Sequence, residues 1–119
     1  MVGVERVDDR VVARFRLPAE FVGFQGHFPG RPVLPAVCEI MAVVAVWQAW
    51  TGRAVTVDEV VSAKFPASVF PDQTFAVECV ELVDGRDGEN LKAAIECDGK
   101  RVAQVVLRVV VGGRVECEP

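Results

Sequence analysis

The chain has 119 residues, of which 51% are hydrophobic and 25% are charged, so it suits one globular domain and not a disordered segment. A net charge of -4 and the lack of any basic run argue against nucleic-acid binding. The N-terminus lacks the basic and apolar parts of a secretory signal, and the longest apolar stretch, Ala36 to Trp50, is too short to cross a bilayer. We therefore expect a cytoplasmic protein without a membrane span.

The first half of the chain predicts a strand, an ordered loop and a helix. Residues Val11 to Leu17 alternate in polarity, as a half-buried strand does, and Ala19 to Pro35 is rich in aromatic, glycine and proline residues. Ala36 to Trp50 follows a proline, stops before Gly52 and is too long for a typical strand, which favours a helix. Because this helix is apolar on almost every side, we expect it to be buried all round by a sheet curled about it.

The second half predicts the sheet. A polar turn spans Asp84 to Asn90, and Asp98-Gly99 is typical of a type I′ hairpin turn. Consecutive hairpins make the sheet antiparallel. The expected strands are Val57 to Lys64, Thr74 to Val83, Leu91 to Cys97 and Arg101 to Val111.

These elements predict an α+β fold in which one long central helix is wrapped by a curved antiparallel β-sheet, the arrangement known as the hotdog fold. We expect a single domain over residues 1–119, with a core from about 7 to 111 and a loose C-terminal tail at 112–119.

The four cysteines predict buried, reduced thiols. No Cys-x-x-Cys pair is present, and the sequence has one histidine, which does not complete a zinc site at these spacings. Three of the thiols fall in apolar or alternating segments, where free cysteine behaves as a small hydrophobic residue. We expect no metal and no disulfide. The four are Cys38, Cys79, Cys97 and Cys117.

The loop before the helix carries the most specific pattern of the chain. The run Gly26-His27-Phe28-Pro29-Gly30-Arg31-Pro32-Val33-Leu34-Pro35-Ala36-Val37 closely resembles the signature of the bacterial 3-hydroxyacyl-(acyl-carrier-protein) dehydratases. In that family His-Phe-Pro-Gly-x-Pro, two apolar residues and Pro-Gly-Val enter the central helix of a hotdog fold. A weaker resemblance lies at residues 63–65 and 69–75, which are similar to the family's Lys-Phe-x-x-Pro-Val-x-Pro-Gly-Asp segment.

The resemblance implies dehydration of a (3R)-hydroxyacyl thioester to a trans-2-enoyl thioester, without a metal or redox cofactor. His27 is the expected base that removes the C2 proton, and a backbone N–H of Ala36 or Val37 is the expected donor to the thioester carbonyl. Such a weakly acidic proton needs both a placed base and stabilisation of the enolate-like oxygen. Phe28, Gly30 and Met41 are further expected substrate contacts.

Two positions depart from the family pattern: Ala36 replaces the usual glycine of Pro-Gly-Val, and the helix acid is missing. The family's helix acid, donated by the other subunit of a dimer, lies fourteen positions after the histidine, where this chain has Met41. Glu39 is a candidate for a displaced acid, but two helical residues turn about 200°, so Glu39 should face almost opposite to Met41. Two structural explanations of Glu39 stay open: an ion pair with Arg31 or Lys64, or exposure at the helix start, where the dipole favours an anion.

The sequence therefore predicts an acyl-thioester-binding, dehydratase-like lyase of fatty-acid or related lipid or polyketide synthesis. Three alternatives stay open: an acyl thioesterase in which Glu39 orients water, a non-catalytic acyl-binding subunit, and a heterodimer whose partner brings the acid. The expected partners are an acyl carrier protein or coenzyme A thioester, a possible carrier protein, and a second copy of the chain in a homodimer or higher homo-oligomer.

Overall fold

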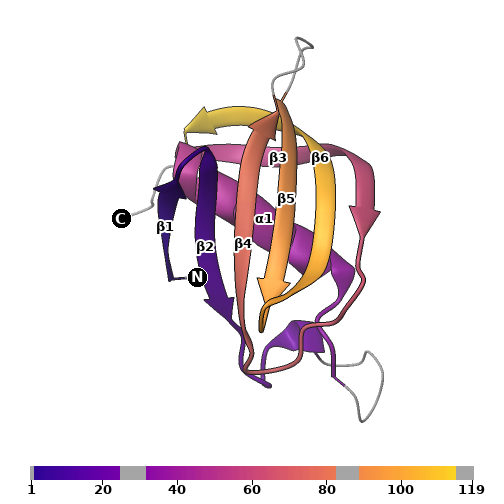
Figure 1. Ribbon diagram of the computed structural model, residues 1–119. Helices are drawn as coiled ribbons and strands as arrows, with labels where there is room; N and C mark the ends of the chain where they lie inside the picture. Colours follow the sequence, from indigo (N-terminus) through magenta and orange to yellow (C-terminus); the bar gives the residue numbers. More distant parts are fainter. Residues whose placement is uncertain (1, 25–31, 83–88, 115–119) are drawn as a thin grey trace.

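The computed structural model describes residues 2–24, 32–82 and 89–114 and consists of one α-helix and an antiparallel sheet (Figure 1). Expectation and structure agree closely on the helix, which starts at the expected residue and ends one residue later. The elements in chain order are β1 (Val2–Val7), β2 (Arg10–Arg16), the short 3-10 helix η1 (Val22–Phe24), α1 (Ala36–Thr51), β3 (Arg53–Lys64), β4 (Thr74–Leu82), β5 (Glu89–Cys97) and β6 (Lys100–Arg114).

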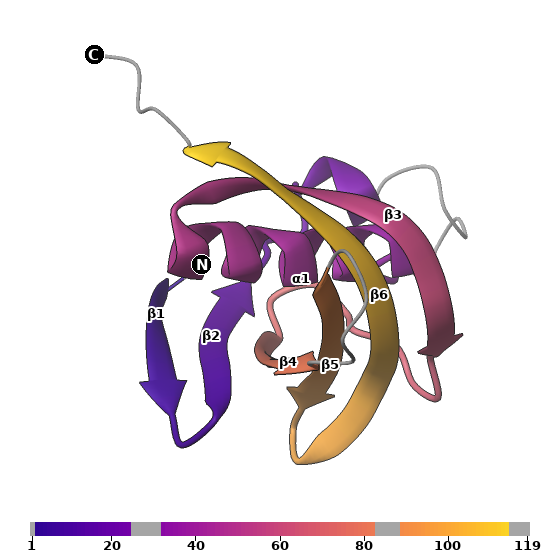
Figure 2. The same cartoon turned by 90° about the horizontal axis from the view of Figure 1, so that it is seen from above.

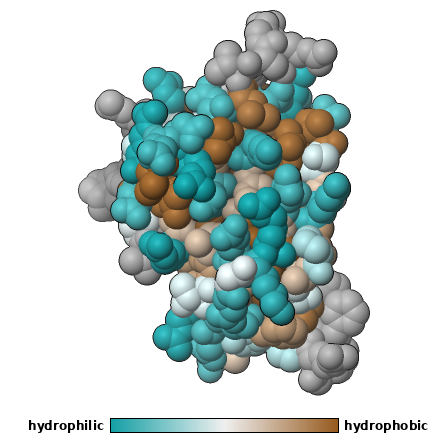
Figure 3. All heavy atoms as spheres, in the orientation of Figure 1, coloured by the Kyte–Doolittle hydropathy of each residue, from teal (hydrophilic) through white to brown (hydrophobic). Residues whose placement is uncertain are grey.

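The strands form one sheet in the order β1-β2-β4-β5-β6-β3, in which every neighbouring pair is antiparallel. Figures 1 and 2 show that the sheet curves about α1, which lies against its concave face. The opposite, convex face is seen in Figure 3, where hydrophilic side chains predominate and apolar patches lie between them. The expected hotdog fold, α+β with one central helix, is confirmed.

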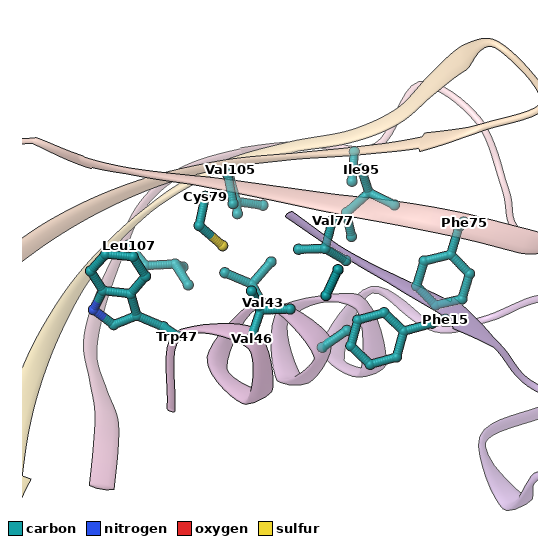
Figure 4. Packing of buried hydrophobic residues seen from close by; sticks show 14 of the residues in the cluster. Phe15, Val43, Val46, Trp47, Phe75, Val77, Cys79, Ile95, Val105 and Leu107 are labelled. Atoms are coloured by element: carbon teal, nitrogen blue, oxygen red, sulfur yellow. The ribbon is translucent and has the colours of Figure 1, made fainter. Parts of the chain in front are cut away.

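The core lies between the inner side of α1 and the sheet, as Figure 4 shows. Val43 and Val46 of the helix are completely buried, and Trp47 is 5% exposed. Phe15 of β2 and Phe75 of β4 are cross-strand partners whose rings stack with centroids 5.3 Å apart. Interdigitation of these large side chains fixes the helix against the sheet, because native cores leave few voids.

Several expected boundaries are confirmed and others are wrong, such as the start of β3, which lies at Arg53 and not at Val57. Asp98 and Gly99 both have positive φ, at 52° and 76°, as a type I′ turn requires. Strand β1 lies where we expected none, because Gly3, at φ 45°, produces a register shift that hides the alternating pattern. Strand β6 extends to Arg114, so the tail expected to be loose from residue 112 is in part paired, with Arg114 opposite Arg53.

The expectation that α1 is buried on all sides is wrong for the single chain. The sheet covers one side of the helix, and on the other side Val37 and Met41 are 62% and 63% exposed. The helix composition alone does not show which face meets the sheet.

Among the described residues, no helix has the length and hydrophobicity needed to cross a membrane.

Candidate active site

Helix α1 begins with two backbone N–H groups that have no acceptor among the residues that the structure describes. Pro35 occupies the N-cap position with an extended backbone (φ -64°, ψ 150°) and makes no side-chain cap. The N–H groups of Cys38 and Glu39 both donate to the Pro35 carbonyl, at 3.0 and 3.2 Å. The preceding N–H groups, of Ala36 and Val37, have no hydrogen-bond acceptor in the described part of the chain. Orphan N–H groups at a helix start can donate to a ligand oxygen.

The segment that enters α1 is fixed by the loop between β3 and β4. The N–H of Leu34 donates to the Val69 carbonyl at 2.8 Å, and both side chains are buried. The same loop is closed by Phe70, whose N–H donates to Oε1 of Gln73 at 2.9 Å, and Nε2 of Gln73 donates to Asp98 at 2.9 Å. The start of the helix is thus held by the second of the two motifs that resemble the dehydratases.

The start of α1 is also in close contact with the short helix η1. A Cβ added to Gly23 would lie 3.0 Å from Sγ of Cys38 and 2.5 Å from the ring of Phe21. The Phe21 ring also meets Phe24 edge-on, with centroids 6.0 Å apart, and Phe24 is buried. The absence of a side chain at Gly23 therefore lets η1 pack directly on the first turn of the helix.

Glu39 and Met41 face opposite sides of α1, as the helical rotation predicts. Glu39 is 3% exposed and lies on the inner face, one turn before Val43. Burial raises the pKa of its carboxyl to about 7. Exposure at the helix start, one of the two explanations considered, is therefore wrong. In residues 2–24, 32–82 and 89–114 no cation pairs with Glu39, which excludes the ion pair with Lys64; Arg31 lies outside these residues.

Met41 lies in an apolar groove of about 490 Å³ on the outer face of α1. The described residues that line the groove carry no charge, so the position to which the resemblance assigns the acid holds a thioether in apolar surroundings. The sequence does not single out this groove, because the helix is apolar on nearly every side and each face offers apolar residues at i, i+4 and i+7. The groove is lined by Val37, Ile40, Met41, Val44, Ala45 and Gln48 of α1 and by Val57 of β3.

Of the expected site residues, the structure places Ala36, Val37, Glu39 and Met41. His27, Phe28 and Gly30 lie outside the described residues. The placed residues supply two backbone donors and an apolar wall that begins at Val37. This half of the site can bind a carbonyl oxygen and an acyl chain, and it contributes no acid on the side of Met41.

Three of the cysteines are described, and all three carry free thiols. Cys79 and Cys97 are buried, Cys38 is half-buried, and burial raises the pKa of Cys79 to about 12. Cys117 lies outside the described residues. Among the residues that the structure describes, no three His, Cys, Asp or Glu side chains come together to hold a metal ion.

Comparisons with known structures show the same fold. The chain is similar to the dehydratase heterocomplex ApeI:P from Xenorhabdus doucetiae, with a TM-score of 0.76, 20% identity, and coverage of 91% of this chain and 94% of the other. It is also similar to a hypothetical thioesterase with coenzyme A from Streptococcus pneumoniae, with a TM-score of 0.70 and 12% identity over 96% and 88% of the two chains.

Sequence comparisons are more specific. The chain is 32% identical over 112 residues to 3-hydroxyacyl-(acyl-carrier-protein) dehydratase FabZ of Enterococcus faecalis. The aligned region covers 87% of this chain and 79% of that enzyme. Its identity to the FabZ dehydratase of Latilactobacillus sakei is also 32%, over 84% and 76% of the two chains. The ApeI-like family model, described as ApeI dehydratase, matches residues 4–105. The chain therefore belongs to the ApeI-like family of hotdog-fold dehydratases.

Proposed function

We propose that this chain binds a (3R)-hydroxyacyl thioester and supplies the base and the carbonyl-binding half of a dehydratase site. The observation that carries the proposal is the pair of uncapped N–H groups at Ala36 and Val37, which directly follows the motif containing His27. Both groups point along the helix axis away from α1, where the positive end of the helix dipole favours a developing negative charge.

The reaction eliminates water without a redox change. His27 takes the C2 proton, the electron pair of that C–H bond forms the C2=C3 double bond, and the C3–O bond breaks. The oxygen of the thioester carbonyl gains negative charge as the proton leaves, and the N–H groups of Ala36 and Val37 stabilise it. The departing hydroxyl takes up a proton and leaves as water. In the absence of a separate acid, His27 returns the abstracted proton to that hydroxyl, which requires both to lie on one face of the substrate.

Glu39 is not required as the acid in this scheme. Its carboxyl is on the inner face of α1, whereas the family's acid occupies the outer face, at the position of Met41. A carboxyl with a pKa near 7 is a suitable proton donor, but it must also reach the proton acceptor. Burial of Glu39 against the sheet side of the helix favours a structural role over that of a displaced acid.

Three variants test the proposal with 3-hydroxyacyl and trans-2-enoyl thioesters assayed in both directions. A general acid typically raises the rate of a reaction by about 10²- to 10⁴-fold. Met41→Glu should therefore raise the slow dehydration rate of the unaltered chain by a factor within that range. His27→Ala should abolish turnover, and Glu39→Gln should leave it unchanged in a folded protein. Activity that survives His27→Ala would refute the proposal, and loss of activity in folded Glu39→Gln would instead support the displaced acid.

A thioesterase is the second candidate, because a solved neighbour is a hypothetical thioesterase with coenzyme A. In that reaction Glu39 would orient the attacking water, which its burial opposes. The products separate the two functions: hydrolysis releases a free thiol, whereas dehydration keeps the thioester and creates a conjugated double bond. Thioester binding with neither product would identify a non-catalytic acyl-binding subunit.

The carrier we propose is an acyl carrier protein, because the curated relatives are named as acyl-carrier-protein dehydratases. The test is to measure kcat/KM for the same acyl group attached to an acyl carrier protein and to coenzyme A. The carrier with the higher kcat/KM is the preferred one. We also propose that the working unit contains at least two hotdog chains. One similar structure is a heterocomplex, and the apolar outer face of α1 is uncovered in the single chain.

A further inference from the structure

We propose that Gln73 is a positioning residue for the thioester carbonyl, because its side chain orients the peptide unit that fixes the start of α1. This inference rests on the proposed function, since it concerns the N–H groups of Ala36 and Val37. Gln73 itself lies in the loop between β3 and β4, so its influence reaches these groups through other residues.

One peptide unit of this loop carries two hydrogen bonds. Its carbonyl, which belongs to Val69, accepts from the N–H of Leu34 at 2.8 Å. Its N–H, which belongs to Phe70, donates to Oε1 of Gln73 at 2.9 Å. Because a peptide unit is planar, its N–H and its carbonyl cannot turn independently. The side chain of Gln73 therefore sets the direction of the carbonyl that binds Leu34.

Two further hydrogen bonds fix Gln73 itself. Its backbone N–H donates to the Phe70 carbonyl at 3.3 Å, which closes a turn whose third residue, Asp72, has a positive φ of 66°. Its Nε2 donates to Oδ2 of Asp98 at 2.9 Å, in the hairpin between β5 and β6. Gln73, Phe70 and Asp98 also line a cavity of about 230 Å³, so hydrogen bonds more than packing hold this side chain. The amide group of Gln73 thus links the turn to the sheet.

The first residue of α1 lies two positions after Leu34. Between them stands Pro35, whose ring restricts its φ, here -64°. A rotation of the Val69 carbonyl would shift Leu34. The short, stiff connection would then pass this shift to the N–H groups of Ala36 and Val37. Because a misplacement of about 1 Å can cost about 10²-fold in rate, the hydrogen bonds of Gln73 bear on the reaction as well as on stability.

The carbonyl stretching frequency of a bound thioester tests this inference. The probe is the octanoyl thioester of an acyl carrier protein, isotope-labelled at the carbonyl carbon, which has no hydroxyl to eliminate. Hydrogen bonds from N–H groups polarise a carbonyl and lower its stretching frequency. Gln73→Met keeps the length of the side chain and removes both of its hydrogen bonds, so the frequency should move back toward that of the free thioester. A role in stability alone would lower the midpoint of thermal unfolding without this change.

Dehydration kinetics give a second readout. The carbonyl oxygen gains negative charge as the C2 proton leaves, so misplaced donors weaken binding of the transition state more than binding of the substrate. Gln73→Met should therefore lower kcat about tenfold, with a smaller change in KM. This loss is below the range of about 10²- to 10³-fold for complete removal of one such donor.

Two further variants supply the rescue and the control. The double variant Gln73→Glu, Asp98→Asn reverses the polarity of the link: one carboxylate oxygen accepts from the Phe70 N–H, and the other accepts from the introduced amide. Asparagine also suits the positive φ of 52° at this turn position. This double variant should restore both the frequency and kcat. Gln104→Met makes the same substitution on β6 and should leave both unchanged.

The outcomes separate this inference from the function on which it rests. If the unaltered chain does not lower the carbonyl frequency of the thioester, the carbonyl-binding part of the proposed function fails, and the inference fails with it. If the unaltered chain and folded Gln73→Met lower the frequency equally, the inference is wrong and the proposed function stands. A double variant that restores neither readout would also overturn the inference. If Gln73→Met does not fold, Asp98→Gly, which suits the same φ and removes only the link to the hairpin, decides between the same outcomes.

Discussion

The backbone N–H of Leu34 donates to the carbonyl of Val69 over 2.8 Å, joining the residue two positions before α1 to the loop that leads into β4. Each residue lies in one of the two segments of the sequence that resemble the dehydratases. Through this contact the second segment holds the backbone of the first. The position of the N–H groups of Ala36 and Val37 thus depends on a loop more than thirty residues away.

Glu39 makes the stability of the protein depend on pH. Because its pKa is raised from 4.5 to about 7 in the folded state, the folded protein binds more protons than the unfolded chain between these values. The free energy of unfolding should therefore fall as the pH rises from about 4.5 through 7, by on the order of 3 kcal/mol in total, and then level off. Urea unfolding at pH 5, 7 and 8.5 measures this change.

The matched variant for this prediction is Glu39→Gln, which keeps the shape and removes the titration. Its free energy of unfolding should vary less over this pH range and exceed that of the unaltered chain at pH 8.5. Parallel pH profiles for the two proteins would show that Glu39 is not the group responsible.

Gly23→Ala should destabilise the protein by about 1–3 kcal/mol, the usual cost of overpacking. The added methyl group would meet the Phe21 ring and Sγ of Cys38, so η1 or the first turn of α1 must move. The measurement is the midpoint of thermal unfolding, with Gly113→Ala as control, since an added Cβ there meets nothing within 4 Å. An equal effect of the two substitutions would contradict the close approach at Gly23.

Phe75→Ala should cost about 3–5 kcal/mol in unfolding free energy, because it removes a ring that is 1% exposed and stacks on Phe15. The exposed Leu82 at the end of β4 offers a control on the same strand. Leu82→Ala should change stability by less than about 1 kcal/mol. Chemical denaturation of both variants tests the comparison, and a small loss for Phe75→Ala would mean that the core collapses around the cavity.

The thiols should react in an order set by burial. Denatured, unreduced protein should show four reactive thiols, as expected for a chain without disulfides. In the native protein at pH 8, Cys38 should react faster than Cys79, because Cys79 is fully buried and has a pKa near 12. Timed labelling followed by mass spectrometry of peptides gives both rates. Fast labelling of native Cys79 would indicate that the sheet opens over it.

Much of the fold was predictable because its signals are local. Pro35 and Gly52 delimit the helix, and Gly52 indeed has a left-handed conformation, φ 68°, with its N–H bonded to Gln48 at 2.8 Å. The opposite orientation of Glu39 and Met41 was also predictable, because it follows from the rotation per helical residue alone.

Other features depend on contacts between distant parts of the chain and were not predictable in this way. The helix is apolar on nearly every side, so its pattern did not indicate that Glu39 faces the core and Met41 faces outward. Strand β1 was hidden by the glycine at its register shift. The anchoring of Leu34 by Val69 joins loops, for which the sequence has no periodic signal.

The helix that begins at Pro35 has no side-chain cap, and serine, threonine, asparagine or aspartate at such a position typically adds about 1 kcal/mol of stability. A cap works by accepting hydrogen bonds from the first-turn N–H groups, which are the donors assigned here to the thioester. Mutations that stabilise α1 by capping would therefore compete with substrate for the same atoms. Under the proposed function, stability gained by capping α1 would therefore be accompanied by weaker binding of the thioester carbonyl.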